Sequence, residues 1–285
     1  MKIFTSVFLR SYLLQGFWNY AQMQNVGAFF ALTPALKEIY KQDEQGLRHA
    51  AARSLEAFNT NPVLSTYVLG ALIGQERKIA AAPLTPSQPA LPAGLPAAAP
   101  QRQDEEREYR IIRAGTANTA ASLGDRLFWA TLKPLSLVLC LAVLLGAQVQ
   151  ILHEDLPSGG AGFAAALAVF ASLLLYNVPA IAARVKGLID GLRGTEDDFY
   201  GLIKINWNRI IYFLKTLGQI FTVFVIFCGL YLRFRGADFN AELAARFALC
   251  AAFVVLSIFM KKLNIPNMFL YLGAAAFFTA ASLLA

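Results

Sequence analysis

The chain has 285 residues, of which 57% are hydrophobic and 15% are charged, and its formal net charge is +7. Soluble domains typically have about 45–50% apolar and about 25% charged residues, so the composition argues against an ordinary soluble protein. The positive charge indicates membrane topology and argues against nucleic-acid binding, because no basic stripe interleaved with aromatic residues occurs on a soluble segment.

The N-terminal region, residues 1–79, is expected to be a helical region with re-entrant or half-depth helices. Its first residues, MKIFTSVFLRSYLLQGFW, contain a short apolar stretch that Arg10 interrupts. No small-residue cleavage site follows, so no cleavable signal peptide is expected.

A first polar cluster lies in the stretch QGFWNYAQMQNVG. Gln15, Asn19 and Gln22 stand at positions i, i+4 and i+7, which predicts one helical face with three uncharged amides. Gln24 and Asn25 extend the polarity around the helix. Amides offer donors and acceptors without charge, which suits a neutral polyhydroxylated ligand. The alternative is that these amides bond to neighbouring helices and fix their packing.

A second polar cluster opens the stretch LEAFNTNPVLSTYVLGALIG, residues 55–74. Asn61 followed by Pro62 is typical of a helix start, with an amide cap and a proline at the first helical position. The apolar run from Val63 to Gly74 is shorter than the roughly 20 residues that cross a bilayer, which predicts a re-entrant or half-depth helix. In transporters such helices aim their N-termini into the substrate cavity. The alternative is an ordinary helix-turn-helix corner.

Residues 80–101 contain six prolines and almost no charge. Proline removes a backbone donor and fixes φ, so this stretch is predicted to be a linker. The segment RQDEEREYRIIR that follows can form a solvated helix with opposite charges at i, i+4 spacing. We expect residues 80–114 to form a cytoplasmic Pro/Ala-rich linker and charged helix.

A third polar cluster is the stretch SLGDRLFWATLKPL. Ser122 and Asp125 fit the S-x-x-D capping pattern, and Pro134 predicts a kink or a restart of the helix. Asp125 is therefore either a helix cap at the membrane surface or an acid at a broken-helix junction in a transport pathway, since ionisable groups inside a membrane tend to be functional. Arg126 and Lys133 are expected to be anchors on the cytoplasmic side.

Residues 115–285 are expected to form a transmembrane helical domain, because five apolar runs each approach the length of a membrane-spanning helix. The predicted spans are 134–152, 161–183, 210–232, 244–260 and 266–285. The predicted fold class is all-α, a polytopic membrane protein with about five C-terminal spans. Basic residues concentrate in the loop 184–209, which predicts that this loop, the linker and the N-terminal region are cytoplasmic.

Residue types that carry catalysis are sparse in this sequence. The two histidines, His49 and His153, are predicted on opposite sides of the membrane. Cys140, Cys228 and Cys250 fall inside predicted spans, without CxxC or Cys/His ligand spacing. No Gly-rich phosphate loop or hydrolase motif occurs. We therefore expect no catalytic residue, no metal site and no cofactor.

Taken in order, the three polar blocks resemble enzyme IID of the mannose/fructose/sorbose-type sugar phosphotransferase system, as a divergent member. FLRSYLLQGFWNYAQMQNVGAFFALTPALKEIY resembles that family's opening block, and LEAFNTNPVLSTYVLGALIGQE is similar to its F-N-T-x-P block. SLGDRLFWATLKPL is similar to its G-D-x-x-F-W-x-T-x-[RK]-P block. RVKGLIDGLRG and KKLNIPNMFLYLGAAAF are similar to later segments of the family.

The resemblance implies a non-catalytic membrane subunit that forms a sugar-translocation complex with enzyme IIC, while soluble IIA and IIB subunits relay phosphate from phosphoenolpyruvate. It implies a hexose-type sugar and a multi-pass location in the bilayer of a bacterial inner (cytoplasmic) membrane. It also implies six candidates for the sugar pathway or the IIC interface: Asn19, Gln24, Asn25, Asn59, Thr60 and Asp125.

The chain departs from the family pattern at several positions. Where the family has N-[YF]-E-R-M-Q-N, this chain has Ala21 and Gln22, so an acid and a base are lost together, as expected for a dropped ion pair. Ser54 replaces the family's histidine before the F-N-T block, and Gln75 with Glu76 replaces a Glu-Glu pair. These departures motivate an alternative function, a non-transporting membrane regulator or scaffold that retains the IID fold.

Overall fold

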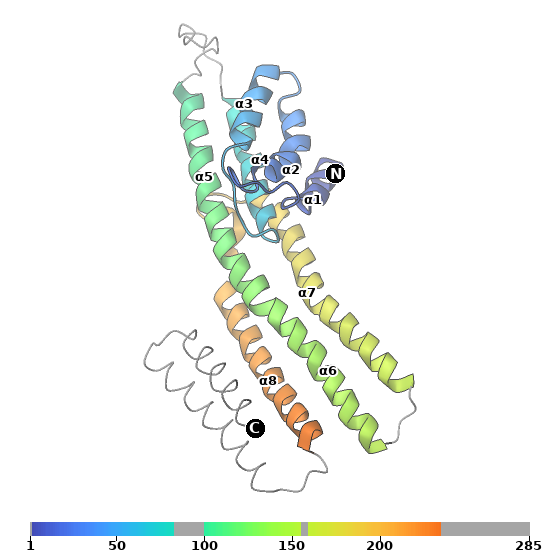
Figure 1. The fold of residues 1–285 in the computed structure, drawn as a ribbon. Coiled ribbons are helices and arrows are strands. Elements are labelled where there is room, and N and C mark those ends of the chain that lie inside the picture. Colours follow the sequence, from blue (N-terminus) through green and yellow to red (C-terminus); the bar gives the residue numbers. More distant parts are fainter. Residues whose placement is uncertain (1, 83–99, 155–158, 235–285) are drawn as a thin grey trace, which may run out of the picture. The chain divides into compact units, whose positions relative to one another are not determined.

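The computed structural model describes residues 2–82, 100–154 and 159–234 (Figure 1). Within these ranges the chain forms helices joined by turns and contains no strand, which confirms the predicted all-α class. The elements in chain order are α1 (Lys2–Ser11), α2 (Asn25–Ile39), α3 (Glu44–Ser54), α4 (Ser65–Ala81), α5 (Pro100–Gly124), the π-helix η1 (Asp125–Leu132), α6 (Lys133–Glu154), α7 (Gly159–Arg193), the 3-10 helix η2 (Phe199–Lys204) and α8 (Trp207–Phe234). The contacts below lie within one compact unit, Met1–Leu230.

Three helical stretches of the described chain are long and apolar enough to cross a membrane: Gln103–Gln148, Gly162–Arg193 and Phe199–Leu232. They overlap the first three predicted spans. The predicted spans 244–260 and 266–285 lie outside the described residues, together with Cys250 and the motif KKLNIPNMFLYLGAAAF. Most of the predicted linker, residues 83–99, lies outside them as well.

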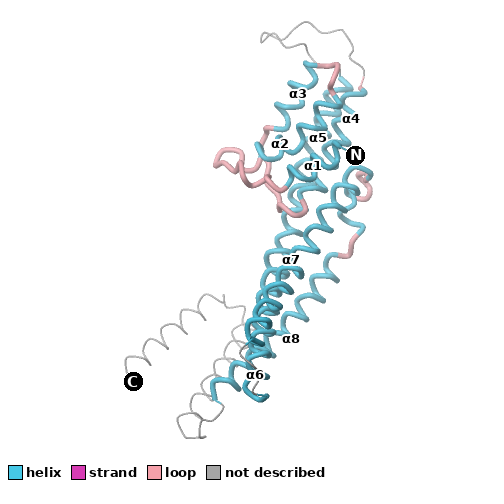
Figure 2. Tube along the Cα trace, turned by 90° about the vertical axis from the view of Figure 1, so that its right-hand side faces the viewer, coloured by secondary structure: helices cyan, strands magenta, loops and turns pink. Residues whose placement is uncertain are grey.

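The shorter helices α2, α3 and α4 pack with the first part of α5 at one end, and α6, α7 and α8 extend away from them (Figures 1 and 2). Helix α4 lies at the centre of this group, because 12 of its 17 residues are buried. The largest fully buried side chains of the core include Leu14, Leu32, Leu36, Tyr67, Leu72, Tyr109 and Phe128. The predicted short apolar helix is therefore the core helix of this unit.

Helix α4 crosses α7 at a contact between glycine residues. A Cβ atom added to Gly70 would lie 2.8 Å from the backbone carbonyl carbon of Gly191, and one added to Gly191 would lie 2.3 Å from the backbone oxygen of Tyr67. One added to Gly187 would lie 2.6 Å from the Tyr67 ring. Small residues at a helix crossing let two backbones approach closely. The segment RVKGLIDGLRG thus supplies the face of α7 that packs on α4.

The first polar cluster is a loop, so the predicted helical face of Gln15, Asn19 and Gln22 is wrong. The backbones of Asn19 and Met23 exchange two hydrogen bonds of 2.9 Å, and Met23 has a φ of 59°. The Asn19 side chain also accepts from the Gln22 backbone N–H at 2.8 Å. An asparagine side chain that bonds to nearby backbone groups competes with helix formation, and here it stabilises the turn.

Helix α4 begins at Ser65, three residues later than the predicted start at Pro62. Asn61 does accept a hydrogen bond from the Val63 backbone N–H, at 3.0 Å. That bond closes a turn over residues 62–64, and the regular helical bonds begin only after it. The predicted amide cap is therefore present, but it caps the turn that leads into the helix.

The third polar cluster lies inside one continuous helical rod formed by α5, η1 and α6. Ser122 and Asp125 do not cap a helix start, so the predicted capping box is wrong. Pro134 does not restart the helix either. The π-helix before it widens the turn, so that the Lys133 N–H bonds to the oxygen of Phe128, five residues back. This shift brings the proline into the rod without a break, and the rod bends in this region (Figure 1).

A buried ion pair joins α3, α4 and α5. Arg53 donates to the Glu76 carboxylate at 2.8 Å, and the two side chains are 3% and 0% exposed. Tyr40 donates to the same carboxylate at 2.7 Å, and Arg53 also pairs with Glu106 at 2.7 Å. Burial lowers the pKa of Arg53, but the hydrogen bond and the charge of Glu76 outweigh it, so this pKa lies above its usual value. Arg53 therefore stays charged, and its contacts with Glu76 and Glu106 join the three helices.

Candidate functional site

The first two polar blocks meet at Gln24, the residue that precedes α2. Its side-chain amide donates to the Thr60 backbone oxygen at 3.1 Å and accepts from the Thr60 backbone N–H at 3.0 Å. The Gln24 backbone N–H also donates to the oxygen of Phe58 at 2.8 Å. Gln24 and Thr60 are both buried. This reciprocal pairing satisfies backbone groups that lie away from water in two non-helical loops, seen side by side in Figure 2.

Asn19 and Asn25 complete the joint between these two loops. The Asn19 side-chain amide donates to the amide oxygen of Asn25 at 2.9 Å. The Asn25 amide in turn donates to the backbone oxygen of Leu55 at 2.7 Å. The predicted candidates of the first block thus bind each other and the backbone of the second block, as the packing alternative expects.

The second and third blocks meet at Asn61 and Asp125. The Asn61 side-chain amide donates to the Asp125 carboxylate at 2.9 Å, and the Thr60 hydroxyl donates to the backbone oxygen of Ala117 at 2.9 Å. The approach depends on Gly124, because a Cβ atom there would lie 2.3 Å from Cγ of Asn61. Asp125 itself is exposed and opens the π-helix. We call the meeting place of the three blocks the amide junction, defined by Gln24, Thr60, Asn61 and Asp125.

The charged residues after Asp125 turn toward other partners. Arg126 donates to the side-chain oxygen of Asn208 in α8 at 3.2 Å. The Lys133 ammonium stands over the Trp129 ring, 4.9 Å from its centroid. Such a cation over an exposed tryptophan is typical of the membrane–water boundary.

A cavity of about 430 Å³ opens beside the amide junction, between the α3–α4 loop and one face of α5. Asn59 is the predicted candidate that lines it. Other residues that line it include Glu56, Phe58, Arg110, Arg113 and Asn118. Carboxylate, amide and guanidinium groups around an aromatic ring offer the donors and acceptors that a hydroxyl-rich ligand of this size requires.

The arginines of this cavity are held in fixed positions. Arg110 pairs with the Glu56 carboxylate at 3.0 Å. Arg113 donates to the backbone oxygens of Arg53, Ser54 and Glu56, the last at 2.6 Å. Carbonyls at a helix end carry partial negative charge and lack partners within the helix. Arg113 therefore caps the end of α3 and forms a rigid part of the cavity wall.

Four charged or amide residues of this cavity were not predicted from the sequence: Glu56, Arg110, Arg113 and Asn118. A signal for three of them exists, because Arg110, Arg113 and Asn118 recur at near-helical spacing on one face of the charged helix. The sequence does not contain a comparable signal for Glu56, whose place follows from the fold of the α3–α4 loop.

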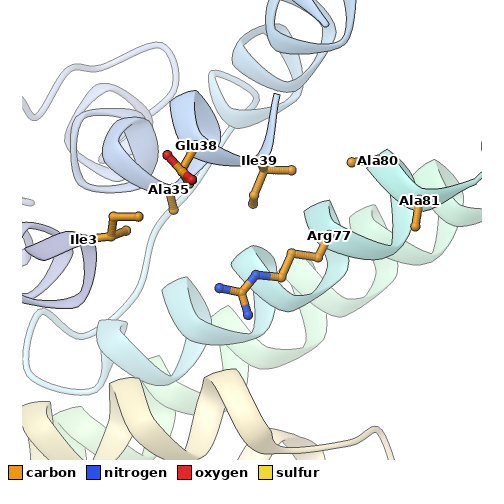
Figure 3. Close-up of a pocket in the computed structure, with 7 residues that line it drawn as sticks. All are labelled: Ile3, Ala35, Glu38, Ile39, Arg77, Ala80 and Ala81. Carbon is orange, nitrogen blue, oxygen red and sulfur yellow. The ribbon is translucent and has the colours of Figure 1, made fainter. Parts of the chain in front are cut away.

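A second cavity of about 400 Å³ lies between α1, α2 and α4 (Figure 3). Glu38 from α2 and Arg77 from α4 lie on its opposite walls, with the alanines Ala35, Ala80 and Ala81 around them. None of the six predicted candidates lines this cavity. The amide junction and the cavity next to it are therefore the candidate functional site.

Comparison with known proteins identifies the family of the chain. The family model of the "PTS system mannose/fructose/sorbose family IID component" matches residues 1–152, which include all three polar blocks. The mannose-specific EIID component of the PTS system of Escherichia coli strain K12 is 27% identical over 188 residues, which cover 65% of this chain and 53% of that protein. The fructose permease IID component of Bacillus subtilis strain 168 is 25% identical over 144 residues, which cover 50% of this chain and 45% of that protein.

The chain spans about half the length of these curated relatives. A solved structure described as "Structure of membrane protein" matches with a TM-score of 0.58 at 18% identity, and the match covers 100% of this chain and 97% of that chain. At this identity the match supports the fold alone. Together with the apolar helices, these relatives make the chain a multi-pass membrane protein. Because the family model covers residues 1–152 of 285, the chain belongs to the mannose/fructose/sorbose family of PTS IID components.

Proposed function

We propose that this chain is the IID subunit of a phosphoenolpyruvate-dependent sugar transporter and forms the translocation complex with enzyme IIC. Soluble IIA and IIB subunits relay the phosphate, and this chain carries no catalytic residue itself. The complex sits in the cytoplasmic membrane of a bacterium. One observation carries the proposal: three polar blocks far apart in the sequence converge at the amide junction, beside a cavity of about 430 Å³.

The proposed division of labour follows from hydrogen bonding. Hydrogen bonds within the chain occupy the polar groups of Gln24, Thr60 and Asn61. We therefore assign these three residues the role of positioning the site. Asn59 and Asn118 line the cavity and supply its amide groups. We propose that these two side chains contact a neutral hexose-type sugar on its path, or the IIC surface that faces this path, and that Asn19, Gln24, Asn25, Thr60 and Asp125 act as positioning residues.

The proposed domain layout keeps the boundaries of the sequence analysis. Residues 1–79 form the helical region that builds the amide junction. Residues 80–114 form a cytoplasmic linker and charged helix, and residues 115–285 form the membrane domain. The candidate site lies where the second and third of these parts meet the first, since the Thr60 hydroxyl bonds to Ala117.

Purification with a partner tests this proposal first. The chain is co-expressed with a IIC subunit of the same family, and the complex is isolated through a tag on IIC. We expect stable co-purification. If the chain remains separate from every IIC subunit tried, the transporter proposal fails.

Uptake then tests the site. The complex is reconstituted in vesicles with IIA, IIB and phosphoenolpyruvate, and the accumulation of labelled hexose phosphate is measured. We expect Asn59→Ala and Asn118→Ala to reduce uptake several-fold, and Glu38→Ala in the other cavity to leave it unchanged. Equal uptake by all three variants would remove this cavity from the pathway.

A non-transporting regulator is the second candidate function, and one observation favours it: the amides of Gln24 and Asn25 are already bonded within the chain. A regulator retains the fold and the IIC contact but carries no sugar. A complete, assembled system that gives no sugar-dependent uptake or phosphorylation, while the chain still co-purifies with IIC, supports this alternative.

A further inference from the structure

Helix α1 and the turns that follow it present one face to the core. Val7, Ser11 and Leu14 stand at i, i+4 and i+7, and all three are buried. Leu14 also touches the neighbouring helix closely, since a Cβ atom on Gly27 of α2 would collide with its backbone. The orientation of this segment is therefore fixed by packing.

The opposite face is exposed although it is apolar. Leu9 and Leu13 are 60% and 52% exposed. With them lie Ile3, Tyr12, Phe17 and Trp18, which are exposed as well. A surface helix that faces water carries polar residues on its outer side, and a contiguous exposed apolar patch marks an interaction site. We call these six residues the α1 surface. Among the described residues, Arg184 contacts this surface at Tyr12 and Phe30 contacts it at Phe17.

Helix α1 lies beside the end of α7 that packs on the short helices (Figure 1). Arg184 of α7 donates to the Ser11 hydroxyl at 3.2 Å, and its guanidinium stands over the Tyr12 ring, 4.3 Å from the centroid. One turn before Arg184, Ile181 is an exposed apolar residue of the same helix, and Val178 precedes it at 57% exposure. The α1 surface thus contacts α7 close in sequence to exposed apolar residues of a helix that is apolar enough to cross a membrane.

We propose that the α1 surface lies in the membrane–water interface, with its aliphatic side chains in the lipid and its aromatic side chains at the level of the headgroups. Tyrosine and tryptophan are enriched at that level because each has an apolar body and a polar tip. Helix α1 begins at Lys2, which is exposed, and a cation near the membrane surface is attracted to anionic lipids. The helix anchors the cytoplasmic end of the chain to the bilayer without crossing it.

The surroundings favour lipid over a protein partner as the occupant. The α1 surface meets α7 where Arg184 contacts Tyr12, within the stretch Gly162–Arg193 that is long and apolar enough to cross a membrane. Arg10 turns inward, where it donates to the Phe30 backbone oxygen at 3.2 Å and stands over the Phe30 ring. The Arg10 guanidinium is thereby kept away from the outer face, which suits insertion among acyl chains.

Collision accessibility of a spin label tests this proposal. The full chain, with its three cysteines replaced by serine, receives a single nitroxide through Leu13→Cys, and a matched control carries it through Arg48→Cys on the exposed face of α3. Both variants are reconstituted alone in vesicles of phosphatidylethanolamine and phosphatidylglycerol. Circular dichroism verifies the helical content of each variant.

We expect dissolved oxygen to relax the label at position 13 several-fold more than a water-soluble nickel chelate does, and the reverse order at position 48. Greater access of the chelate at position 13 overturns the proposal. If the chelate reaches position 13 in these vesicles and is excluded only after IIC is added, the α1 surface is a subunit interface, and the proposal is overturned in favour of that partner. Neither readout depends on sugar uptake, so the result stands apart from the proposed transport function.

Discussion

The side-chain amide of Asn61 donates a hydrogen bond to the carboxylate of Asp125 over 2.9 Å, across 64 residues of sequence. This contact joins the turn that leads into α4 to the first residue of the π-helix η1. It thereby links the second and third polar blocks, which lie far apart in the sequence.

The charge of Asp125 is the first quantity to test. Asp125→Asn keeps the shape of the side chain but removes its negative charge, whereas Arg126→Ala removes a side chain that reaches Asn208 instead. We expect Asp125→Asn to impair uptake or assembly with IIC more than Arg126→Ala does, measured with the reconstituted complex. If both changes have equal and negligible effects, Asp125 is an exposed surface acid without a role in transport or assembly.

The second prediction concerns the space around Gly124. Gly124→Ala places a Cβ atom 2.3 Å from Cγ of Asn61, so Asn61 must move away from Asp125. We expect a loss of about 1–3 kcal/mol in the free energy of unfolding, the usual cost of overpacking, measured by denaturant unfolding in detergent. Gly115→Ala on the same helix is the control, because its Cβ atom would lie 3.5 Å from the Phe199 ring.

At Gly115 the substitution removes a residue that weakens helices by about 0.5–1 kcal/mol relative to alanine. The control should therefore be neutral or slightly more stable than the native chain. If Gly124→Ala is as stable as Gly115→Ala, the contact between α5 and the α3–α4 loop is looser than the distance between Gly124 and Asn61 indicates.

The third prediction concerns the buried ion pair between Arg53 and Glu76. Glu76→Gln removes the charge that Arg53 faces at 2.8 Å, and leaves Glu106 as its remaining acidic partner. Breaking a buried pair by removing one partner costs about 3–5 kcal/mol; because Glu106 remains, we expect about 3 kcal/mol. Unfolding in detergent measures the change.

Glu44→Gln is the matched control for this prediction. Glu44 pairs with Arg48 at 2.7 Å, but both side chains are 78% exposed. An exposed pair contributes at most about 1 kcal/mol. A similar loss for Glu76→Gln and Glu44→Gln would mean that water reaches the Arg53–Glu76 pair.

The fourth prediction concerns how the stability of the α7–α8 connection depends on pH. Asp198 pairs with Lys204 at 2.6 Å, and its carboxylate accepts hydrogen bonds from the backbone N–H groups of Thr195 and Gly201. The hydrogen bond from Lys204 lowers the pKa of Asp198 most, burial opposes it, and the two N–H groups lower it further. Its stabilising effect is therefore complete above the unfolded pKa of about 3.9 and is lost as the pH falls through the lower folded pKa.

Thermal unfolding at several pH values checks this expectation. Asp198→Asn should melt at a lower temperature than the native chain at neutral pH, and the difference should vanish in strong acid, where Asp198 is protonated in both states. Asp197→Asn, at the exposed neighbouring position, should change the melting temperature little at any pH. A difference that stays constant across the whole pH range contradicts the role of the Asp198 charge.

Local patterns predicted the helices and the first three spans, because the length of an apolar run depends on the sequence alone. They failed at Asn19, whose side chain closes a turn and finds a partner in Asn25, a choice that tertiary contacts decide. At Pro134 they predicted a kink or a restart, and the structure has a bend without a break, because a π-helix absorbs the proline and has no simple sequence signal. The functional roles of the six candidate residues remain predictions, although the structure brings their blocks together.

The continuous rod of α5, η1 and α6 has a mechanical consequence. Asn118 in the cavity wall belongs to α5, and Leu137 in the membrane segment belongs to α6 of the same rod. A tilt of α6 therefore acts as a lever on α5. The wide turn at Asp125 is the point where that lever is least regular, and Asn61 is fastened to it. We therefore expect a change in bilayer thickness, or a movement of a partner subunit, that tilts α6 to move the cavity wall as well.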